Sequence, residues 1–363
     1  MTKVKISYFS DYPFSIGFGG KEIQMLTYLR YLNLYYKDEF EVNLLNYWSK
    51  YADYDILHLF GHGRFLHIIE NVRNNNRKIK IVISPTLYIN KSSIVLKSTF
   101  YLGSILPFKN TPKNIILELE HADAVIVNSY SEKSFLLKNI TSKIDFKTHV
   151  IYNGIDDDFN ELRDEDRNIF IKNFNLLPNS YILSVGMMDE RKNTVNLLKA
   201  FLSVYHIIKK KLVIIGNFRF TNKSAFEEVS NLLTKNKDKI IHVEFIDKDK
   251  DLDMLKSAYY NCAYHLLPSY IETPGIANIE ALYFGKNIVV GMCPPVKEYF
   301  GDIAIYCAPK DINSIANAIL EADKMPYYNE KNVELVRDKY IYSKIVNQLV
   351  KVYNDVLSYE WVS

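Results

Sequence analysis

The sequence predicts an α/β protein with two doubly wound domains followed by a terminal helix. Short runs rich in β-branched residues alternate with stretches of helical periodicity, which is typical of parallel sheets covered by helices. The length of 363 residues suits two domains of roughly 150 residues each. Hydrophobic residues make up 48% and charged residues 24% of the chain, so the chain can bury two cores.

Two successive sets of predicted strands define the two sheets. The first set comprises residues 3–9, 55–60, 80–84, 124–129 and 149–153. The second set comprises residues 181–186, 211–216, 241–246, 263–269 and 287–291. Between the sets lies "GIDDDFNELRDEDRNIF", a polar, acid-rich stretch typical of a connection between domains. We therefore expect a first domain over residues 1–155 and a second over residues 156–340.

The last segment, residues 341–363, is predicted to be an amphipathic helix. Its apolar residues recur at steps of three and four, as one buried helix face requires. These residues are Ile341, Ile345, Val346, Leu349, Val352, Val356 and Leu357.

Composition excludes several other classes of protein. Three cysteines, at positions 262, 293 and 307, are too few and too unpatterned for a disulfide framework or a zinc site, and they favour a reducing compartment. The first ten residues, "MTKVKISYFS", lack the apolar core of a signal peptide, and no apolar run is long enough to span a membrane. The net charge of +3 is small and no nucleic-acid-binding motif is present. We expect a cytoplasmic protein that does not bind nucleic acid.

Glycines follow the first predicted strand and precede a helix, in "SIGFGGKEIQMLTYLRYL". Gly17, Gly19 and Gly20 would let a phosphate approach the backbone at a helix N-terminus. A dinucleotide-binding fingerprint needs a further glycine at position 22, where this chain has Glu22, so a dehydrogenase is disfavoured. The alternative is that these glycines only shape a turn.

The second domain opens with "SVGMMDERKN", in which a predicted strand is followed by Arg191 and Lys192. In open α/β sheets, ligands bind beyond the carboxyl ends of the strands. The two cations are therefore candidates for binding an anion, although an adjacent Arg-Lys pair on a surface is more often simply solvated.

A second candidate stretch, "PSYIETPGIANIEALYFGKNIVV", carries two glutamates separated by seven residues. Glu272 follows a predicted strand, Gly275 begins a helix, and Glu280 lies further along that helix. Such carboxylates can accept hydrogen bonds from the hydroxyls of a sugar or a ribose. The alternative is that Glu272 caps the helix, where negative charge is favoured, and that Glu280 is an ordinary surface residue.

Taken together, the order and spacing of these segments resemble glycosyltransferase family 4, over nearly the whole chain. Further matching pieces are "GFGGKE", "HADAVIVNSYSEKSFL", "VIYNGID" and "GDIAIYCAPKDINSIANAI". The fold of that family is GT-B, in which two Rossmann-like domains face each other across a cleft. We expect the C-terminal helix to pack back towards the first domain.

The resemblance implies a role for each matching residue. The glycine loop, with Gly19 and Gly20, and the basic residue Lys192 would approach the diphosphate of a nucleotide-sugar donor. Glu272 would lie against the donor sugar and Glu280 against the ribose. Backbone groups would complete the diphosphate site at Pro274, Gly275 and Ile276.

The chain departs from the family pattern at two places. Met187 stands where many members have an arginine, and Arg191 would supply the missing charge. A histidine commonly follows the third or fourth strand of the first domain, where this chain has "SPTLY". Ser84, His58 and His62 are the acceptor-side candidates nearby, although a histidine at a strand end is more often structural.

The implied activity is transfer of a hexosyl or N-acetylhexosaminyl unit from a UDP- or GDP-sugar to a glycan or lipid-linked glycan, in surface polysaccharide or glycoconjugate synthesis. The family retains the configuration of the anomeric carbon and usually needs neither metal nor cofactor. Fixed cations and N–H dipoles aimed at the leaving diphosphate would stabilise the charge that develops there. The string nearest to a metal-binding Asp-x-Asp cluster, at 156–158, lies in the expected linker.

Three rival functions stay open. A glycoside hydrolase would use Glu272 and Glu280 as its paired carboxylates, but the phosphate-binding elements would then be unexplained. A sugar-nucleotide epimerase of GT-B fold fits the "RKN" turn less well. A non-catalytic partner subunit that binds a nucleotide sugar would explain Met187 and the missing histidine.

Residues 71–113 contain eight Lys and Arg residues and no Asp or Glu. The same window includes "TFYLGSILPF", whose apolar side chains together with the basic ones suit an anionic membrane surface. The alternative is a basic surface above apolar side chains that face the core. We expect peripheral attachment to the inner face of a membrane.

Overall fold

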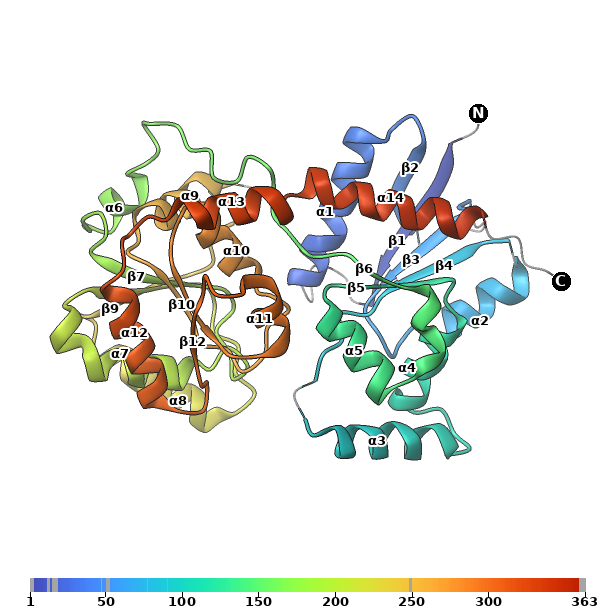
Figure 1. Cartoon of the computed structure of the whole chain (residues 1–363), viewed down its shortest axis with the longest axis horizontal. Helices are drawn as coiled ribbons and strands as arrows, with labels where there is room; N and C mark the ends of the chain where they lie inside the picture. Colours follow the sequence, from blue (N-terminus) through green and yellow to red (C-terminus); the bar gives the residue numbers. More distant parts are fainter. Residues whose placement is uncertain are drawn as a thin grey trace. The chain divides into compact units, whose positions relative to one another are not determined.

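The computed structural model describes residues 3–11, 14, 19–46, 48–49, 53–76, 78–89, 91–247 and 250–358, which form two compact units (Figure 1). Unit 1 combines residues 1–153 with 342–363, and unit 2 comprises residues 154–341. Within the described residues each unit holds one six-stranded sheet, and every paired strand runs parallel to its neighbour. The predicted α/β class with two doubly wound domains is confirmed.

The sheet of unit 1 has the strand order β2-β1-β3-β4-β5-β6. The strands are β1 (Val4–Ser10), β2 (Phe40–Leu44), β3 (Ile56–Phe60), β4 (Lys80–Ser84), β5 (Ala124–Val127) and β6 (Thr148–Val150). The five predicted strands are all present, and β2 was not predicted. Strand order reverses between β1 and β3, so the carboxyl ends of these two strands flank the position where such sheets bind ligands.

Helices cover both faces of this sheet. They are α1 (Gly20–Tyr35), α2 (Leu66–Asn75), α3 (Ser93–Ile105), α4 (Thr111–His121), α5 (Tyr130–Asn139) and α14 (Tyr342–Ser358). Successive strand residues point to opposite faces. Ile56 and Phe60 therefore pack with α1 and α14, whereas Leu57 and Leu59 pack with α2, α3, α4 and α5.

Helix α14 returns to unit 1 after the chain has passed through unit 2. Its apolar stripe is buried as the periodicity predicts, from Ile345 to Val356, in the same core as Ile6 and Tyr8 of β1. The hydroxyls of Tyr8 and Tyr353 are 2.8 Å apart and hydrogen-bonded. The expectation that the C-terminal helix packs on the first domain is thereby confirmed.

The sheet of unit 2 has the strand order β12-β11-β10-β7-β8-β9. The strands are β7 (Tyr181–Val185), β8 (Lys211–Ile215), β9 (Ile240–Val243), β10 (His265–Leu267), β11 (Ile288–Gly291) and β12 (Ile305–Cys307). The five predicted strands are present and β12 was not predicted. Strand order reverses between β7 and β10, which marks their carboxyl ends as the expected ligand position of this sheet.

The helices of unit 2 complete the second doubly wound domain. They are α6 (Ile169–Asn173), α7 (Thr194–Ile208), α8 (Lys223–Lys235), α9 (Leu252–Asn261), α10 (Ile276–Tyr283), α11 (Pro294–Phe300), α12 (Ile312–Asp323) and α13 (Glu330–Lys339). Helices α7 and α12 share one core with the sheet, in which Leu197, Phe201 and Ile319 are fully buried. None of the helices in the described residues is long and apolar enough to cross a membrane.

Candidate functional site

The loop between β7 and α7 is held by side chains that bond to backbone groups. Lys192 N–H donates to Asp189 Oδ1 at 2.7 Å. Asn193 adopts a left-handed backbone conformation with φ of 61°. Its side-chain Nδ2 donates to the carbonyls of Pro268 and Pro309 at 3.0 and 2.6 Å. These bonds fix the direction in which Arg191 and Lys192 leave the sheet.

The loop between β10 and α10 lies beside the first one. Tyr270 N–H donates to the carbonyl of Arg191 at 2.9 Å, which ties the two loops together. Gly275 has φ of 86°, and a Cβ at this position would lie 3.0 Å from Asn278 Nδ2 and 3.3 Å from Glu272 Oε2. A glycine is therefore needed both for the backbone conformation and for the space beside Glu272.

Glu272 binds both cations of the first loop. Its Oε1 accepts a hydrogen bond from Lys192 Nζ at 2.5 Å and one from Arg191 Nη1 at 3.1 Å. Lys192 and Glu272 are only 8% and 7% exposed, whereas the Arg191 side chain is about half exposed. The sequence-predicted residues Lys192, Arg191 and Glu272 therefore form one cluster at the switch point of the sheet.

The side chains of this cluster shift one another's pKa, and burial lowers the pKa of Lys192 although Glu272 opposes that shift. Burial alone would raise the pKa of Glu272, but the opposing charges of Lys192 and Arg191 outweigh it, and the net result is a pKa below the ordinary carboxylate value. The charge of Glu272 raises the pKa of Arg191 in turn. Glu272 balances one of the two cations, and the nearby carboxylate of Asp189 also favours the charged forms of both. A Lys ammonium has three N–H donors, and the structure shows one of them donated to Glu272.

Helix α10 begins beside the cluster. Pro274 and Gly275 form the turn that leads into the helix, and Ile276 is its first residue. The first N–H groups of a helix have no partner within the helix, and the helix dipole favours negative charge there. The half-exposed guanidinium of Arg191 and the start of α10 both favour an anion at this position.

Glu280 lies further along α10 and is 2% exposed. Its Oε2 accepts a hydrogen bond of 2.7 Å from the hydroxyl of Tyr259, which comes from α9. Tyr259 was not predicted as a site residue, because nothing local distinguishes it from the other tyrosines of the chain. The pairing depends on how α9 and α10 pack together.

A buried polar pair, also not predicted, connects β10 with α10. The backbone N–H of Val185 donates to His265 Nε2 at 3.3 Å, so Nδ1 carries the ring proton and donates to Asn278 Oδ1 at 3.0 Å. Asn278 Nδ2 then donates to the carbonyl of Pro274 at 3.3 Å. Burial lowers the pKa of His265 to about 3, so its ring is neutral at pH 7. The pair therefore orients the turn that contains Gly275.

The glycines of unit 1 lie at the start of α1. Gly20 is the first helical residue and Gly19 precedes it, whereas Gly17 lies outside the described residues. Glu22 caps this helix, because its Oε2 accepts the Gly19 N–H at 3.0 Å and its Oε1 accepts the hydroxyl of Ser10 at 3.0 Å. The N–H group of Gly19 is therefore already hydrogen-bonded to a carboxylate.

His58 and Ser84 lie in the core of unit 1. The ring nitrogens of His58 are hydrogen-bonded to the Tyr353 hydroxyl at 2.7 Å and to Ser84 Oγ at 2.8 Å. Burial lowers the pKa of His58 to about 3. His58 is fully buried and Ser84 is 3% exposed, so the contacts of both residues are those of a structural network between the sheet and α14.

His62 is placed differently from His58. It follows β3 and is partly buried, and its Nδ1 is 2.7 Å from the carbonyl of Pro85. Nearby, Lys21 at the start of α1 forms an ion pair with Asp11, which follows β1. His62 and this ion pair come from the carboxyl ends of β1 and β3, where strand order reverses. Among the described residues, no three His, Cys, Asp or Glu side chains gather in a metal-binding group.

The chain was compared with known protein families and structures. Residues 165–339, nearly all of unit 2, match the family described as "Glycosyl transferases group 1". No curated protein matches the chain.

Several solved structures resemble the whole chain. Sucrose-phosphate synthase of Thermosynechococcus elongatus superposes with a TM-score of 0.75 at 16% identity, over 98% of this chain and 100% of that one. The fold is GT-B. HepE of Anabaena, in complex with UDP-glucose, gives a TM-score of 0.73 at 15% identity, over 97% and 99% of the two chains. A glycosyltransferase of Rickettsia africae gives 0.73 at 16% identity, over 99% and 100%.

Proposed function

We propose that this protein is a retaining glycosyltransferase of family 4, which transfers a sugar from a nucleotide-diphosphate sugar to a glycan or lipid-linked glycan. The observation that carries the proposal is the cluster of Lys192, Arg191 and Glu272 at the switch point between β7 and β10. This cluster lies within the stretch that matches the group 1 glycosyl transferases. Its two cations, with N–H donors beyond those bonded to Glu272, suit a diphosphate, and its carboxylate suits sugar hydroxyls.

In the proposed reaction Lys192 and Arg191 stabilise the leaving nucleoside diphosphate. Negative charge grows on the diphosphate oxygen as its bond to the anomeric carbon breaks, so cations fixed beforehand favour the transition state over the ground state. The Glu272 ion pair holds Lys192 in place before the substrate arrives. The backbone N–H groups of Gly275 and Ile276, at the start of α10, would add further donors, whereas Pro274 has no N–H and the N–H of Gly19 already donates to Glu22.

The two glutamates would bind different parts of the donor. Lys192 and Arg191 both bond to Oε1 of Glu272, while Oε2 lies on the Gly275 side and is the oxygen we assign to the hydroxyls of the donor sugar. Glu280, oriented by Tyr259, would accept hydrogen bonds from the ribose hydroxyls. Sugar and ribose would then be recognised from two positions along the same loop and helix.

The proposed chemistry needs neither metal nor cofactor. An acceptor hydroxyl oxygen bonds to the anomeric carbon on the face from which the diphosphate departs, and its proton passes to the departing phosphate oxygen. The configuration is thereby retained, and no separate general base is required. The donor is a UDP- or GDP-linked hexose or N-acetylhexosamine, and the UDP-glucose complex of HepE favours uridine.

We place this reaction in the cytoplasm, in the synthesis of a surface polysaccharide or glycoconjugate. The three cysteines are buried and free, which suits a reducing compartment.

Met187 favours a second candidate function, that of a partner subunit which binds a nucleotide sugar without catalysis. It stands where many members of family 4 have an arginine, and its side chain is 39% exposed at the end of β7. Loss of one cation next to a diphosphate would weaken transition-state stabilisation more than binding. The half-exposed guanidinium of Arg191 is the group that would replace it.

Purified protein distinguishes the two functions. A panel of nucleotides is first screened for thermal stabilisation, because a ligand that binds only the folded state raises its melting temperature. The sugar forms of the nucleotide that binds are then incubated with glycan acceptors, and the anomeric configuration of any product is read by NMR. Retention of configuration supports the proposal. Binding without transfer or donor hydrolysis supports the partner subunit, and inversion would contradict the mechanism.

A further inference from the structure

Helix α3 is apolar on two opposite faces. One face packs on unit 1: Leu96 and Phe100 are about 5% exposed and belong to the core that also contains α4 and α5. Figure 1 shows α3 at the outer edge of unit 1, next to α4. The apolar residues of this segment could face either the core or a membrane surface, and Leu96 and Phe100 face the core.

The other face of α3 is exposed to solvent. Side chains seven and eleven positions apart lie on nearly the same side of a helix. Two such rows run along α3 and its end, and together with the following Phe108 we call them the outer face. Its members and their exposed fractions are Ile94 79%, Tyr101 67% and Ile105 59% in one row, Val95 51%, Leu102 56% and Leu106 38% in the other, and Phe108 59%.

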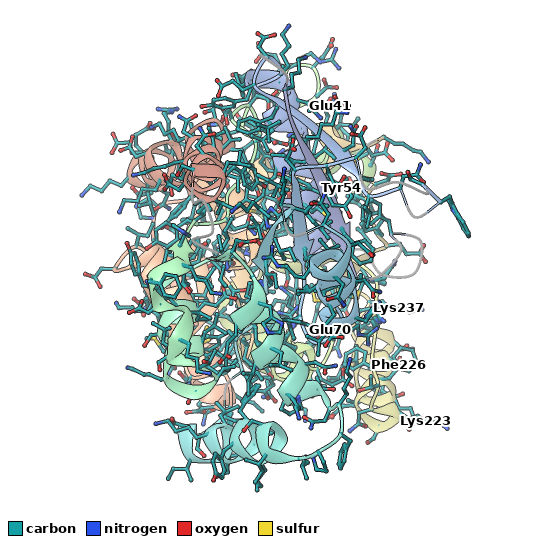
Figure 2. The ribbon with its side chains drawn as sticks, turned by 90° about the vertical axis from the view of Figure 1, so that its right-hand side faces the viewer. Glu41, Tyr54, Glu70, Lys223, Phe226 and Lys237 are labelled. Atoms are coloured by element: carbon teal, nitrogen blue, oxygen red, sulfur yellow. The ribbon has the colours of Figure 1, made fainter. Side chains whose placement is uncertain are left out.

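A helix that is apolar all round is normally buried on all sides. Single exposed apolar residues are common on protein surfaces, but a contiguous set of seven marks a surface that binds something. The side chains are mostly more than half exposed, so they stand out as a ridge and do not line a groove. Figure 2 shows side chains projecting outwards from this helix, at the bottom of the view.

The chain segment that carries the outer face is basic, although Arg73 in it pairs with Asp123 and Lys80 is buried. No Asp or Glu occurs between residues 71 and 113. Lys91 and Lys97 are exposed, and in the described part of the chain no carboxylate forms an ion pair with either of them. Lys109 pairs with Glu70 of α2 at 2.9 Å, and Lys113 donates to the carbonyl of Leu106 at 2.9 Å. A protruding apolar ridge beside Lys91 and Lys97 would fit a partner with a negatively charged outer layer above an apolar interior.

We propose that the outer face of α3 inserts into the headgroup region of an anionic lipid bilayer. The apolar ridge would enter the boundary between headgroups and acyl chains, while Lys91 and Lys97 remain at the level of the phosphates. Aromatic side chains such as Tyr101 suit this boundary, because the ring is apolar and the hydroxyl is polar.

A second copy of the chain fits this surface less well. In a two-fold dimer the same patch contacts itself, so Lys97 of one copy would approach the basic surface of the other. Like charges that meet in an interface oppose association. Lipid phosphates have the opposite charge, and a bilayer accepts a ridge without needing a matching groove.

The test uses the full chain and two kinds of vesicle, phosphatidylcholine alone and phosphatidylcholine mixed with phosphatidylserine. We expect co-sedimentation with the anionic vesicles at low salt, reduced at high salt because salt screens the attraction of the lysines. Replacing Lys91 and Lys97 by Gln should weaken binding about fivefold per lysine. The matched control replaces the exposed Lys223 and Lys237 of unit 2 (Figure 2) and should leave binding unchanged.

The apolar contribution is tested separately. The triple variant Tyr101→Ser, Leu102→Ser, Ile105→Ser should reduce vesicle binding more than tenfold, since each methylene removed from the bilayer weakens binding about fourfold. All three side chains are more than half exposed, so the variant should keep the melting temperature of the parent. Phe226→Ser in α8, 46% exposed, is the control for an apolar side chain outside the outer face (Figure 2).

Three results would overturn the proposal. The first is no binding to anionic vesicles at low salt. The second is equal loss of binding in the α3 variants and their controls. The third is a dimer in solution that the Ser variant dissociates, which would assign the outer face to self-association. Transfer to a water-soluble acceptor does not depend on the bilayer, so failure here is distinguishable from failure of the proposed glycosyltransferase activity.

Discussion

Lys192 Nζ lies 2.5 Å from Glu272 Oε1, and this contact joins two loops whose residues are 80 positions apart in the chain. Both side chains are buried, so each has lost most of its water and depends on the other for compensation. Arg191 contacts the same oxygen from a more exposed position. Removing one member of the cluster therefore changes the charge balance of the whole site.

Replacing Lys192 by Ala should slow sugar transfer by roughly a hundredfold to a thousandfold, the range for losing one preorganised electrostatic donor. Arg191 remains beside Glu272, so the variant should still fold. Lys199→Ala is the matched control, because Lys199 lies on α7 in an exposed pair with Glu228. Initial rates at saturating donor provide the measurement. Wild-type turnover in Lys192→Ala would remove Lys192 from the diphosphate site.

Changing Glu280 or Glu272 to Gln should impair different properties of the protein. Glu280→Gln should weaken binding of the bare nucleoside diphosphate, whereas Glu272→Gln should reduce transfer and leave that affinity nearly intact. Tyr259→Phe should weaken nucleotide binding by about 0.5 to 1.5 kcal/mol, because Glu280 loses the hydrogen bond that orients it. Titration calorimetry measures all three. Equal losses of nucleotide affinity at both glutamates would contradict separate sugar and ribose roles.

Gly275→Ala should destabilise unit 2 more than Gly301→Ala. Both glycines have positive φ, 86° and 51°, so both substitutions carry a backbone cost of about 1 to 2 kcal/mol. A Cβ at Gly275 would also crowd Glu272 and Asn278, whereas one at Gly301 has nothing within 4 Å. Urea unfolding compares the two variants. Equal losses of unfolding free energy would mean that the space beside Glu272 can accept a Cβ at position 275.

The lowered pKa of Glu272 predicts how its contribution to stability depends on pH. In the unfolded chain the carboxyl has its ordinary pKa of 4.5, and in the folded protein the pKa is lower. The unfolded state therefore takes up the proton first, and stability falls as the pH drops from about 4.5 through the folded pKa. Above that window the contribution is complete.

Urea unfolding of wild-type protein and of Glu272→Gln from pH 7 to pH 3 isolates this contribution. The difference in unfolding free energy between the two should be constant at neutral pH and shrink below the ordinary carboxylate pKa. Comparison with the variant removes the effect of the other carboxylates, which titrate in both proteins. A difference that grows on acidification would mean that the folded protein raises this pKa.

Much of the fold follows from local patterns. Most of the predicted strands are buried on both faces, which makes their apolar runs continuous and easy to find, whereas β6 and β9 are only partly buried. Strands β2 and β12, one edge strand of each sheet, were not predicted. In β2 exposed residues such as Glu41 break the apolar run, and Figure 2 labels Glu41 near one end of unit 1.

Site residues could be predicted where charged side chains follow the carboxyl ends of strands, but not where their role depends on packing between elements. Lys192 and Glu272 follow strands that turned out to be neighbours, so their proximity could be inferred from the rule for ligand positions in parallel sheets. Tyr259 and the pair of His265 and Asn278 carry no such local signal. Their importance arises from contacts between elements, which a single sequence does not reveal.

Helix α14 also sets the order in which the protein becomes structured during synthesis. The strands of unit 1 come from the chain before Asn153, yet α14 supplies part of the core around Ile6 and Tyr8. All of unit 2 leaves the ribosome before that helix does. Domains generally fold as units as the chain emerges. Unit 1 therefore completes its core last, and until α14 emerges the part of this sheet face that α1 does not cover remains accessible to chaperones.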